Sequence, residues 1–94
     1  MSETRDLVFI TVIGRDRKGI VARVSTALAA ADINIVDISQ KITEGYFVMT
    51  MLVDMAGTDT SLEQLSAEMD AIGSELALKI QVQHEDLFTM MHRV

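Results

Sequence analysis

The sequence predicts an α+β fold of βαββαβ order, in which a four-stranded antiparallel sheet carries two helices on one face. Three observations lead to this prediction. Four stretches are rich in β-branched residues or alternate between apolar and polar residues, as strands do. Two longer stretches repeat apolar residues every three or four positions, as amphipathic helices do. The middle two strands meet at a short turn that contains glycine, as hairpins do.

Length and composition predict one domain, residues 1–94, with an aliphatic core. Aromatic residues make up only 4% of the sequence, so aliphatic side chains and seven methionines must fill the core. The absence of cysteine excludes disulfides and thiol chemistry. A net charge of −6 argues against nucleic acids and anionic membranes as partners. No apolar stretch suits a signal peptide or a membrane span, which predicts a cytoplasmic protein.

The first part of the chain predicts a strand, a turn and a helix. Leu7–Ile13 is apolar at odd and even positions alike, which is typical of a central strand covered on both faces. A polar turn over residues 14–19 follows, and Ile20–Ala31 repeats apolar residues on one helical face. Asp16 is the predicted N-cap of this helix. The polar segment Met1–Asp6 predicts a frayed start.

A β-hairpin is predicted next. Ile33–Ile42 and Tyr46–Met55 have the composition of strands, and Thr43–Gly45 between them is a tight turn in which the glycine takes a positive φ. Near Asp37 the apolar alternation changes parity, which predicts a β-bulge.

The last part predicts a helix, a strand and a tail. Thr60–Ser61 precedes Glu and Gln at the spacing of a capping box, and apolar residues then step by three and four from Leu62 to Leu76. Gly73 within this helix predicts a close approach to the sheet. Lys79–Glu85 alternates as a strand. Leu87–Val94 is too apolar for a free end and predicts a short C-terminal helix that folds back.

Two right-handed crossovers around one hairpin make this order a ferredoxin-like fold. Both helices then cover the same face of the sheet, and the other face meets solvent. Because the first and third strands are apolar on both faces, the sequence predicts a partner, a second copy of this chain. The fold itself hosts many functions, so the function must be argued from a site.

The sequence predicts no catalytic residues, no metal site and no cofactor. His84 and His92 are eight residues apart on different elements, without a cluster of acidic ligands. The serines lack a nucleophile-elbow motif and a histidine partner at motif spacing. Paired carboxylates for acid–base chemistry are also missing from the pattern.

The turn before the first helix holds the ingredients of a small-ligand site. The carboxylate of Asp16 accepts hydrogen bonds from an ammonium group, and backbone N–H groups at a helix start receive a carboxylate. Gly19 is expected where the backbone must approach something closely. These two complementary demands describe an amino acid.

Other interpretations of this turn stay open. In one, Asp16 only caps the helix and the glycines only meet backbone needs. In another, Arg15, Arg17 and Lys18 hold a phosphate as in acylphosphatases, with Asn34 to orient water, although the acylphosphatase loop pattern is not matched. A nucleic-acid binder would need stacking aromatics in basic surroundings, and the net charge has the wrong sign.

Two segments of the sequence resemble the ACT domain family. Val12–Val24 contains a strand followed by the D-x-x-G turn and two hydrophobic residues that enter a helix, and Ala31–Ile35 contains the D-I-N-I start of a second strand. The resemblance covers nearly the whole chain. It implies a regulatory module that binds amino acids or other small molecules, usually in pairs. Among such proteins the chain is most similar to small stand-alone ACT proteins and to the glycine-cleavage repressor type.

The resemblance also implies where a ligand binds, at the first turn and at the start of the second strand. A helix from Asp16 to Ala31 is about 24 Å long, so a ligand that touches both ends is expected to bridge two subunits. The sequence thus predicts a non-enzymatic, homodimeric, amino-acid-binding module, and the alternative is a structural or protein-interaction domain with a vestigial site. The candidate ligand-binding residues are Gly14, Asp16, Gly19, Ile20, Asn34 and Ile35.

Overall fold

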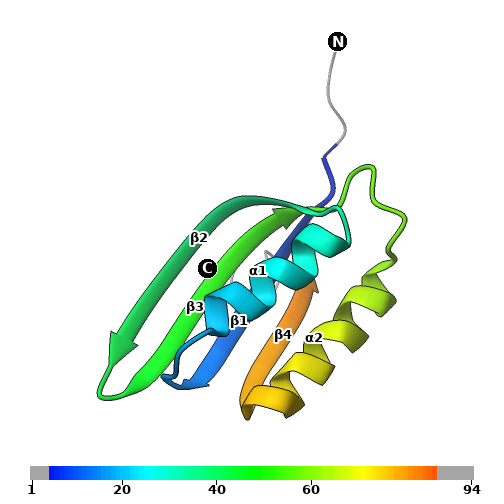
Figure 1. Cartoon of the computed structure of the whole chain (residues 1–94). Helices are drawn as coiled ribbons and strands as arrows, with labels where there is room; N and C mark the ends of the chain where they lie inside the picture. The colour runs from blue at the N-terminus through cyan, green and yellow to red at the C-terminus, as the bar shows by residue number, and fades with distance from the viewer. Residues whose placement is uncertain (1–4, 87–94) are drawn as a thin grey trace.

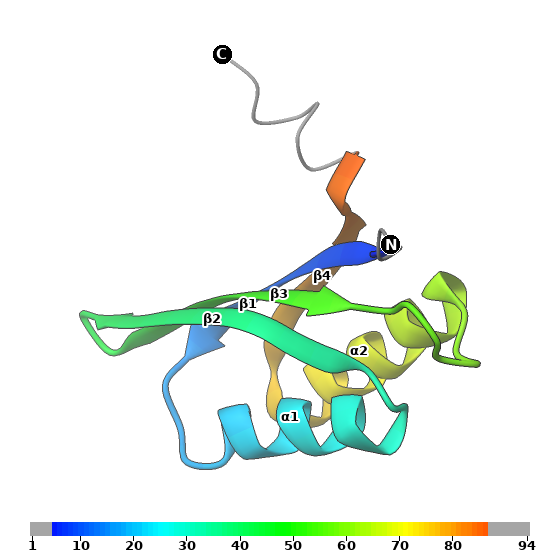
Figure 2. The ribbon, with the colours of Figure 1, turned by 90° about the horizontal axis from the view of Figure 1, so that it is seen from above.

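The computed structural model describes residues 5–86 and has the predicted element order (Figure 1). One antiparallel sheet has the strand order β2-β3-β1-β4, and both helices lie on the same face of it (Figure 2). The ferredoxin-like α+β prediction is confirmed, whereas the predicted C-terminal helix, residues 87–94, lies outside the described residues. The elements are β1 (Leu7–Arg15), α1 (Ile20–Ala30), β2 (Asn34–Thr43), β3 (Tyr46–Asp54), α2 (Leu62–Leu76) and β4 (Leu78–His84).

The core fills the space between the helices and the sheet face that they cover. Every second residue from Val8 to Val12 in β1 and from Phe47 to Val53 in β3 points toward the helices and is at most 4% exposed, which is the period-two pattern of a strand. Methionines contribute to this core as the composition predicts, and each buried large side chain contributes about 1.5–3 kcal/mol. The fully buried residues include Val8, Ile10, Val12, Val24, Leu28, Met49, Met51, Val53, Leu65, Met69 and Ile72.

The other face of the sheet is left open by the elements within residues 5–86 (Figure 2). β1 is a central strand, as predicted, and residues 5–86 cover only its helix side, so the cover expected for its other face stays a prediction. Both crossovers are right-handed, so both helices must lie on one side. On the open side, Ile13 is 44% exposed and its cross-strand neighbour Val48 is 39% exposed.

The β2–β3 hairpin has the predicted turn and the predicted bulge. Glu44 and Gly45 have φ of 54° and 81°, the two positive values that a type I′ turn needs. The β2–β3 register shifts between Ile35 and Asp37, which makes Val36 the extra residue of the bulge.

Helix α2 begins with the predicted capping box and packs closely on β4. The Ser61 hydroxyl accepts a hydrogen bond from the Gln64 N–H, and the Gln64 side chain accepts one from the Ser61 N–H. Nearer the other end of the helix, a Cβ at Gly73 would lie 2.7 Å from the carbonyl oxygen of Leu78. The predicted close approach at Gly73 is therefore confirmed.

Replacing Gly73 with alanine is expected to destabilise the protein. Alanine normally stabilises a helix by about 1 kcal/mol relative to glycine. Here the added methyl group meets backbone, so we expect a net loss of about 1–3 kcal/mol in the free energy of unfolding, measured with urea. Ser74→Ala, at an exposed neighbour, is the control and should stay within about 0.5 kcal/mol of the wild type. A Gly73→Ala protein as stable as the wild type would contradict this packing.

The chain just before β1 is anchored, so the expected fraying is wrong at Asp6. Its carbonyl oxygen accepts a hydrogen bond from the Met55 N–H at 2.8 Å, and its own N–H donates to Asp54 Oδ1 at 3.0 Å. The same Asp54 oxygen also accepts a hydrogen bond from the Ala56 N–H at 3.0 Å. The local sequence pattern of a polar segment does not indicate hydrogen bonds to residues so far away in the chain.

The two N–H groups also lower the pKa of Asp54 below its usual value of 3.8, because hydrogen bonds from Asp6 and Ala56 favour the charged form. A lowered folded-state pKa stabilises the protein above the unfolded value, and this stability is lost as the pH falls through the folded pKa. We therefore expect the stability of the wild type to fall more steeply than that of Asp54→Asn below about pH 4. Parallel pH profiles in chemical unfolding would contradict this role.

Candidate functional site

The predicted site residues lie in two groups at opposite ends of the sheet. Gly14, at the β1–α1 turn, pairs with Phe47 of β3, whereas Asn34, at the start of β2, pairs with Asp54 of the same strand. Phe47 and Asp54 are seven residues apart, which corresponds to about 23 Å along a strand. The fold therefore keeps the two groups apart within one chain.

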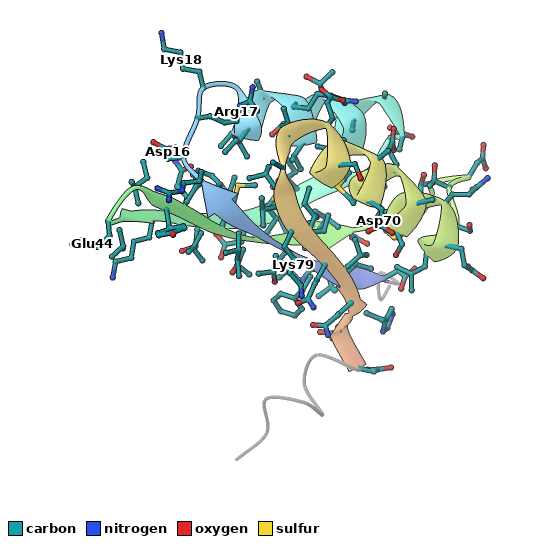
Figure 3. All side chains as sticks on the ribbon, turned by 90° about the horizontal axis from the view of Figure 1, so that it is seen from below. Asp16, Arg17, Lys18, Glu44, Asp70 and Lys79 are labelled. Atoms are coloured by element: carbon teal, nitrogen blue, oxygen red, sulfur yellow. The ribbon has the colours of Figure 1, made fainter. Side chains whose placement is uncertain are left out.

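The prediction that Asp16 caps α1 is wrong. The N-cap is Gly19, and no side chain caps this helix. β1 continues to Arg15, so Asp16 follows the strand directly and its backbone N–H donates to the carbonyl oxygen of Gly45 at 2.9 Å. This bond ties the turn to the β2–β3 hairpin. The Asp16 carboxylate is exposed on the turn, where an external group can meet it (Figure 3).

The two glycines of the turn serve different backbone needs. Gly19 has φ of 87°, and nothing lies within 4 Å of the position of its missing Cβ. No atom of this chain approaches Gly19 closely, and the glycine is needed for its positive φ; the close approach of a ligand at Gly19 stays a prediction. Gly14 is the residue with a close approach, because its Cβ would lie 2.5 Å from Leu78 Cδ2 and 3.3 Å from the carbonyl oxygen of Ala77.

Backbone N–H groups at the start of α1 follow the exposed Asp16 carboxylate along the same turn of the chain. The Arg23 N–H donates to the Gly19 carbonyl oxygen at 2.8 Å in the first helical turn, and the N–H groups before it have no intrahelical acceptor. The Ile20 side chain is 2% exposed and belongs to the core, so this residue offers a ligand only its backbone. Lys18, also exposed on the turn, adds positive charge (Figure 3).

An aromatic residue at this end of the molecule was not predicted as part of the site. Tyr46 pairs with Arg15 across the sheet, and the Arg15 guanidinium carbon lies 4.9 Å from the centre of the Tyr46 ring. The ring is close enough for a cation–π contact. Only the β1–β3 register brings the two residues together, so no local sequence signal identifies them.

The second group displays Asn34 on the outer edge of the sheet. The buried Ile33 fixes the start of β2, and the Ile33 N–H donates to the Leu28 carbonyl oxygen at 3.0 Å. Asn34 is exposed, whereas Ile35 is half-buried against the core. Of this pair, Asn34 is the residue whose side chain an external group can reach.

β2 is an edge strand with uncovered apolar side chains. Ile38 and Ile42 pair with Met51 and Phe47, both buried, and so lie on the helix side of the sheet. They are nevertheless 41% and 60% exposed, because the hairpin extends past α1 (Figure 2). Val36, in the bulge, is 38% exposed. An apolar row next to a free strand edge favours pairing with another strand.

Residues 5–86 contain no group of three or more His, Cys, Asp or Glu side chains arranged to hold a metal ion. Within the same range, no helix is long and apolar enough to cross a membrane. His84 Nε2 lies 2.8 Å from Asp6 Oδ1, and this pair joins β4 to the chain before β1. It therefore lies at the opposite end of the sheet from the β1–α1 turn.

The fold agrees with that of a known family. The ACT domain family matches residues 6–83, so this chain belongs to the ACT domain family. The sequence resemblance in the D-x-x-G turn and the D-I-N-I strand is thereby confirmed.

Individual proteins show where in this family the similarity is strong. A UPF0237 protein of Methanosarcina acetivorans is 47% identical over 91 residues, which are 97% of this chain and 99% of that protein. An ACT domain protein from Streptococcus pneumoniae has a TM-score of 0.79 at 36% identity, over 90% of this chain and 96% of that chain. A structure assigned as a glycine cleavage system transcriptional repressor has a TM-score of 0.76 at 22% identity, over 87% of this chain and 47% of that chain. This last likeness shows the fold alone.

Proposed function

We propose that the chain is a non-enzymatic regulatory module that binds a small molecule, in the first instance an amino acid, as a homodimer. ACT domains are regulatory modules that often bind amino acids. The observation that carries the proposal is the turn itself, where one short segment holds the exposed Asp16 carboxylate and the first N–H groups of α1, which have no intrahelical acceptor. The carboxylate suits the ammonium group of an amino acid, and the N–H groups suit its carboxylate.

The dimer forms by antiparallel pairing of the two β2 edges. This pairing extends the sheet across both subunits, satisfies free backbone groups and buries Ile38 and Ile42. Burying the exposed part of each isoleucine contributes on the order of 1 kcal/mol. A two-fold axis repeats each contact, so a small patch counts twice.

Antiparallel pairing also completes the ligand site. β2 runs from Asn34 to Thr43, and its far end joins the hairpin that accepts the Asp16 N–H. Asn34 of one subunit then lies near the turn of the other. The ligand contacts Asp16 and the Gly19 turn in one subunit and Asn34 in its neighbour, so binding and dimerisation are thermodynamically linked.

The test is a thermal-shift screen of the wild type against the twenty common amino acids, with light scattering at micromolar protein. We expect a dimer mass and a raised Tm with at least one amino acid. A ligand at a hundred times its Kd adds about 2.7 kcal/mol to the free energy of unfolding. Asp16→Ala is the matched control and should lose the shift. A monomer mass would contradict the dimer. A dimer without any shift would favour the alternative, an interaction domain with a vestigial site.

A further inference from the structure

The open face of the sheet carries an apolar strip along its two central strands. The strip consists of two apolar cross-strand pairs, Phe9 with Leu52 and Ile13 with Val48, with the Thr11–Thr50 pair between them. Phe9 and Leu52 are half-buried, and Ile13 and Val48 are exposed. Four residue steps separate Phe9 from Ile13, so the strip is about 13 Å long.

Polar residues border this apolar strip on both sides. On β2, Ser39 and Lys41 continue the same face, and on β4, Lys79 and Gln81 do so. The sheet of a second copy packed face to face would also cover Lys41 and Lys79, at the cost of desolvating their charges. A narrow occupant covers the strip and leaves both lysines in water. The strip thus favours a single helix over a second sheet.

The chain that follows β4 begins beside the apolar strip and in helical conformation, so it can supply such a helix. β4 ends at His84, which pairs with Val8 and therefore lies at the Phe9 end of the strip. Residues 85 and 86 already have helical conformation. His84 Nδ1 accepts a hydrogen bond from the Asp86 N–H at 3.2 Å, as an N-cap side chain does. The acidic residues at these two positions suit a first helical turn.

The residues that follow have the sequence of an amphipathic helix. Leu87, Met90, Met91 and Val94 are spaced i, i+3, i+4 and i+7, which places them on one helical face, and Arg93 falls outside that stripe. A helix over residues 87–94 is about 12 Å long, close to the length of the strip.

We propose that residues 87–94 form an amphipathic helix that covers the apolar strip of the same chain. The apolar stripe of the helix faces Phe9, Ile13, Val48 and Leu52. This contact closes the open face of the sheet to a second copy. The β2 edge is left as the surface for self-association, and the ligand site is not involved.

Cross-linking tests this proposal in the chain of residues 1–94, which contains no cysteine. Thr11→Cys, in the middle of the strip, is combined with Met90→Cys and treated with a short bis-maleimide. We expect a rapid cross-link within one chain. The matched control combines Thr11→Cys with Arg93→Cys, on the polar side of the helix, and should react at least about tenfold more slowly. Equal rates, or a product with the mass of two chains, would overturn the proposal.

A second measurement uses the dye ANS, which binds exposed apolar surface. The double variant Met90→Glu and Met91→Glu is expected to bind several times more dye than the wild type, because the strip becomes uncovered. Thr89→Glu with His92→Glu changes the same number of residues outside the apolar stripe and should leave dye binding unchanged. Equal dye binding by both variants would contradict the docking.

Discussion

A chain with aspartate at both Ile38 and Ile42 is expected to be a monomer at concentrations where the wild type is a dimer. The two substitutions remove apolar surface from the proposed interface, and the two-fold axis brings the four new charges close together. We expect dimer affinity to fall at least about 100-fold, or about 2.7 kcal/mol. Sedimentation equilibrium at micromolar protein measures this change.

The same substitutions should leave the subunit folded, because both isoleucines are largely exposed at the edge of the sheet. Circular dichroism of the variant checks this expectation. The matched control is Gln81→Asp with Lys79→Asp, which adds two aspartates to β4, the opposite edge strand. That variant should remain a dimer. A dimeric Ile38→Asp, Ile42→Asp variant would show that self-association uses another surface.

The second large effect is expected at Asn34. Asn34→Ala should weaken binding of the amino acid by about 5- to 150-fold, because the ligand loses a hydrogen-bond partner in a site closed by two subunits, at a cost of about 1–3 kcal/mol. Asn34 is exposed in the single chain, so its removal should not change the fold. Isothermal titration calorimetry with the amino acid that raises the Tm measures the loss.

The matched control for Asn34→Ala is Gln81→Ala, which removes an exposed amide from the edge strand far from β2. It should bind like the wild type. If the two variants bind the amino acid with equal affinity, Asn34 does not contact the ligand. A dimer mass for both keeps the effect on binding separate from any effect on assembly.

The fold was predictable because its signals are local. The alternation of the strands, the Ser61 capping box and the Gly45 turn each depend on neighbours within a few residues. The change of parity near Asp37 likewise predicted the bulge. Even the close approach at Gly73 has a local reason, since glycine is costly inside a helix without such a need.

The errors concern features that depend on distant parts of the chain. The sequence predicts Asp16 as an N-cap because the apolar run of β1 ends at Ile13, whereas pairing of Arg15 with Tyr46 extends the strand. The backbone need of each turn glycine is also non-local, because only the structure shows that Gly19 has a positive φ and that Gly14 packs against Leu78 of β4. The apolar outer face of β1 indicated a cover without showing what supplies it.

The candidate site was predictable in its two parts and not in its surroundings. The predicted length of the first helix already indicates that Asp16 and Asn34 lie far apart, and the register of the sheet places them at opposite ends of it. The contact of Asp16 with Gly45, and the position of Tyr46 beside Arg15, follow only from strand pairing. These two contacts hold the C-terminal end of β2 and its hairpin beside the β1–α1 turn.

Mixing Asp16→Ala subunits with Asn34→Ala subunits tests the bridged site most directly. Each heterodimer carries one intact site and one doubly damaged site. With equal amounts and free exchange, half of the dimers are heterodimers, so about a quarter of the wild-type sites should return with wild-type affinity. Calorimetry measures the sites, and differently tagged subunits report the exchange. If exchange occurs and no binding returns, the ligand site does not bridge two subunits.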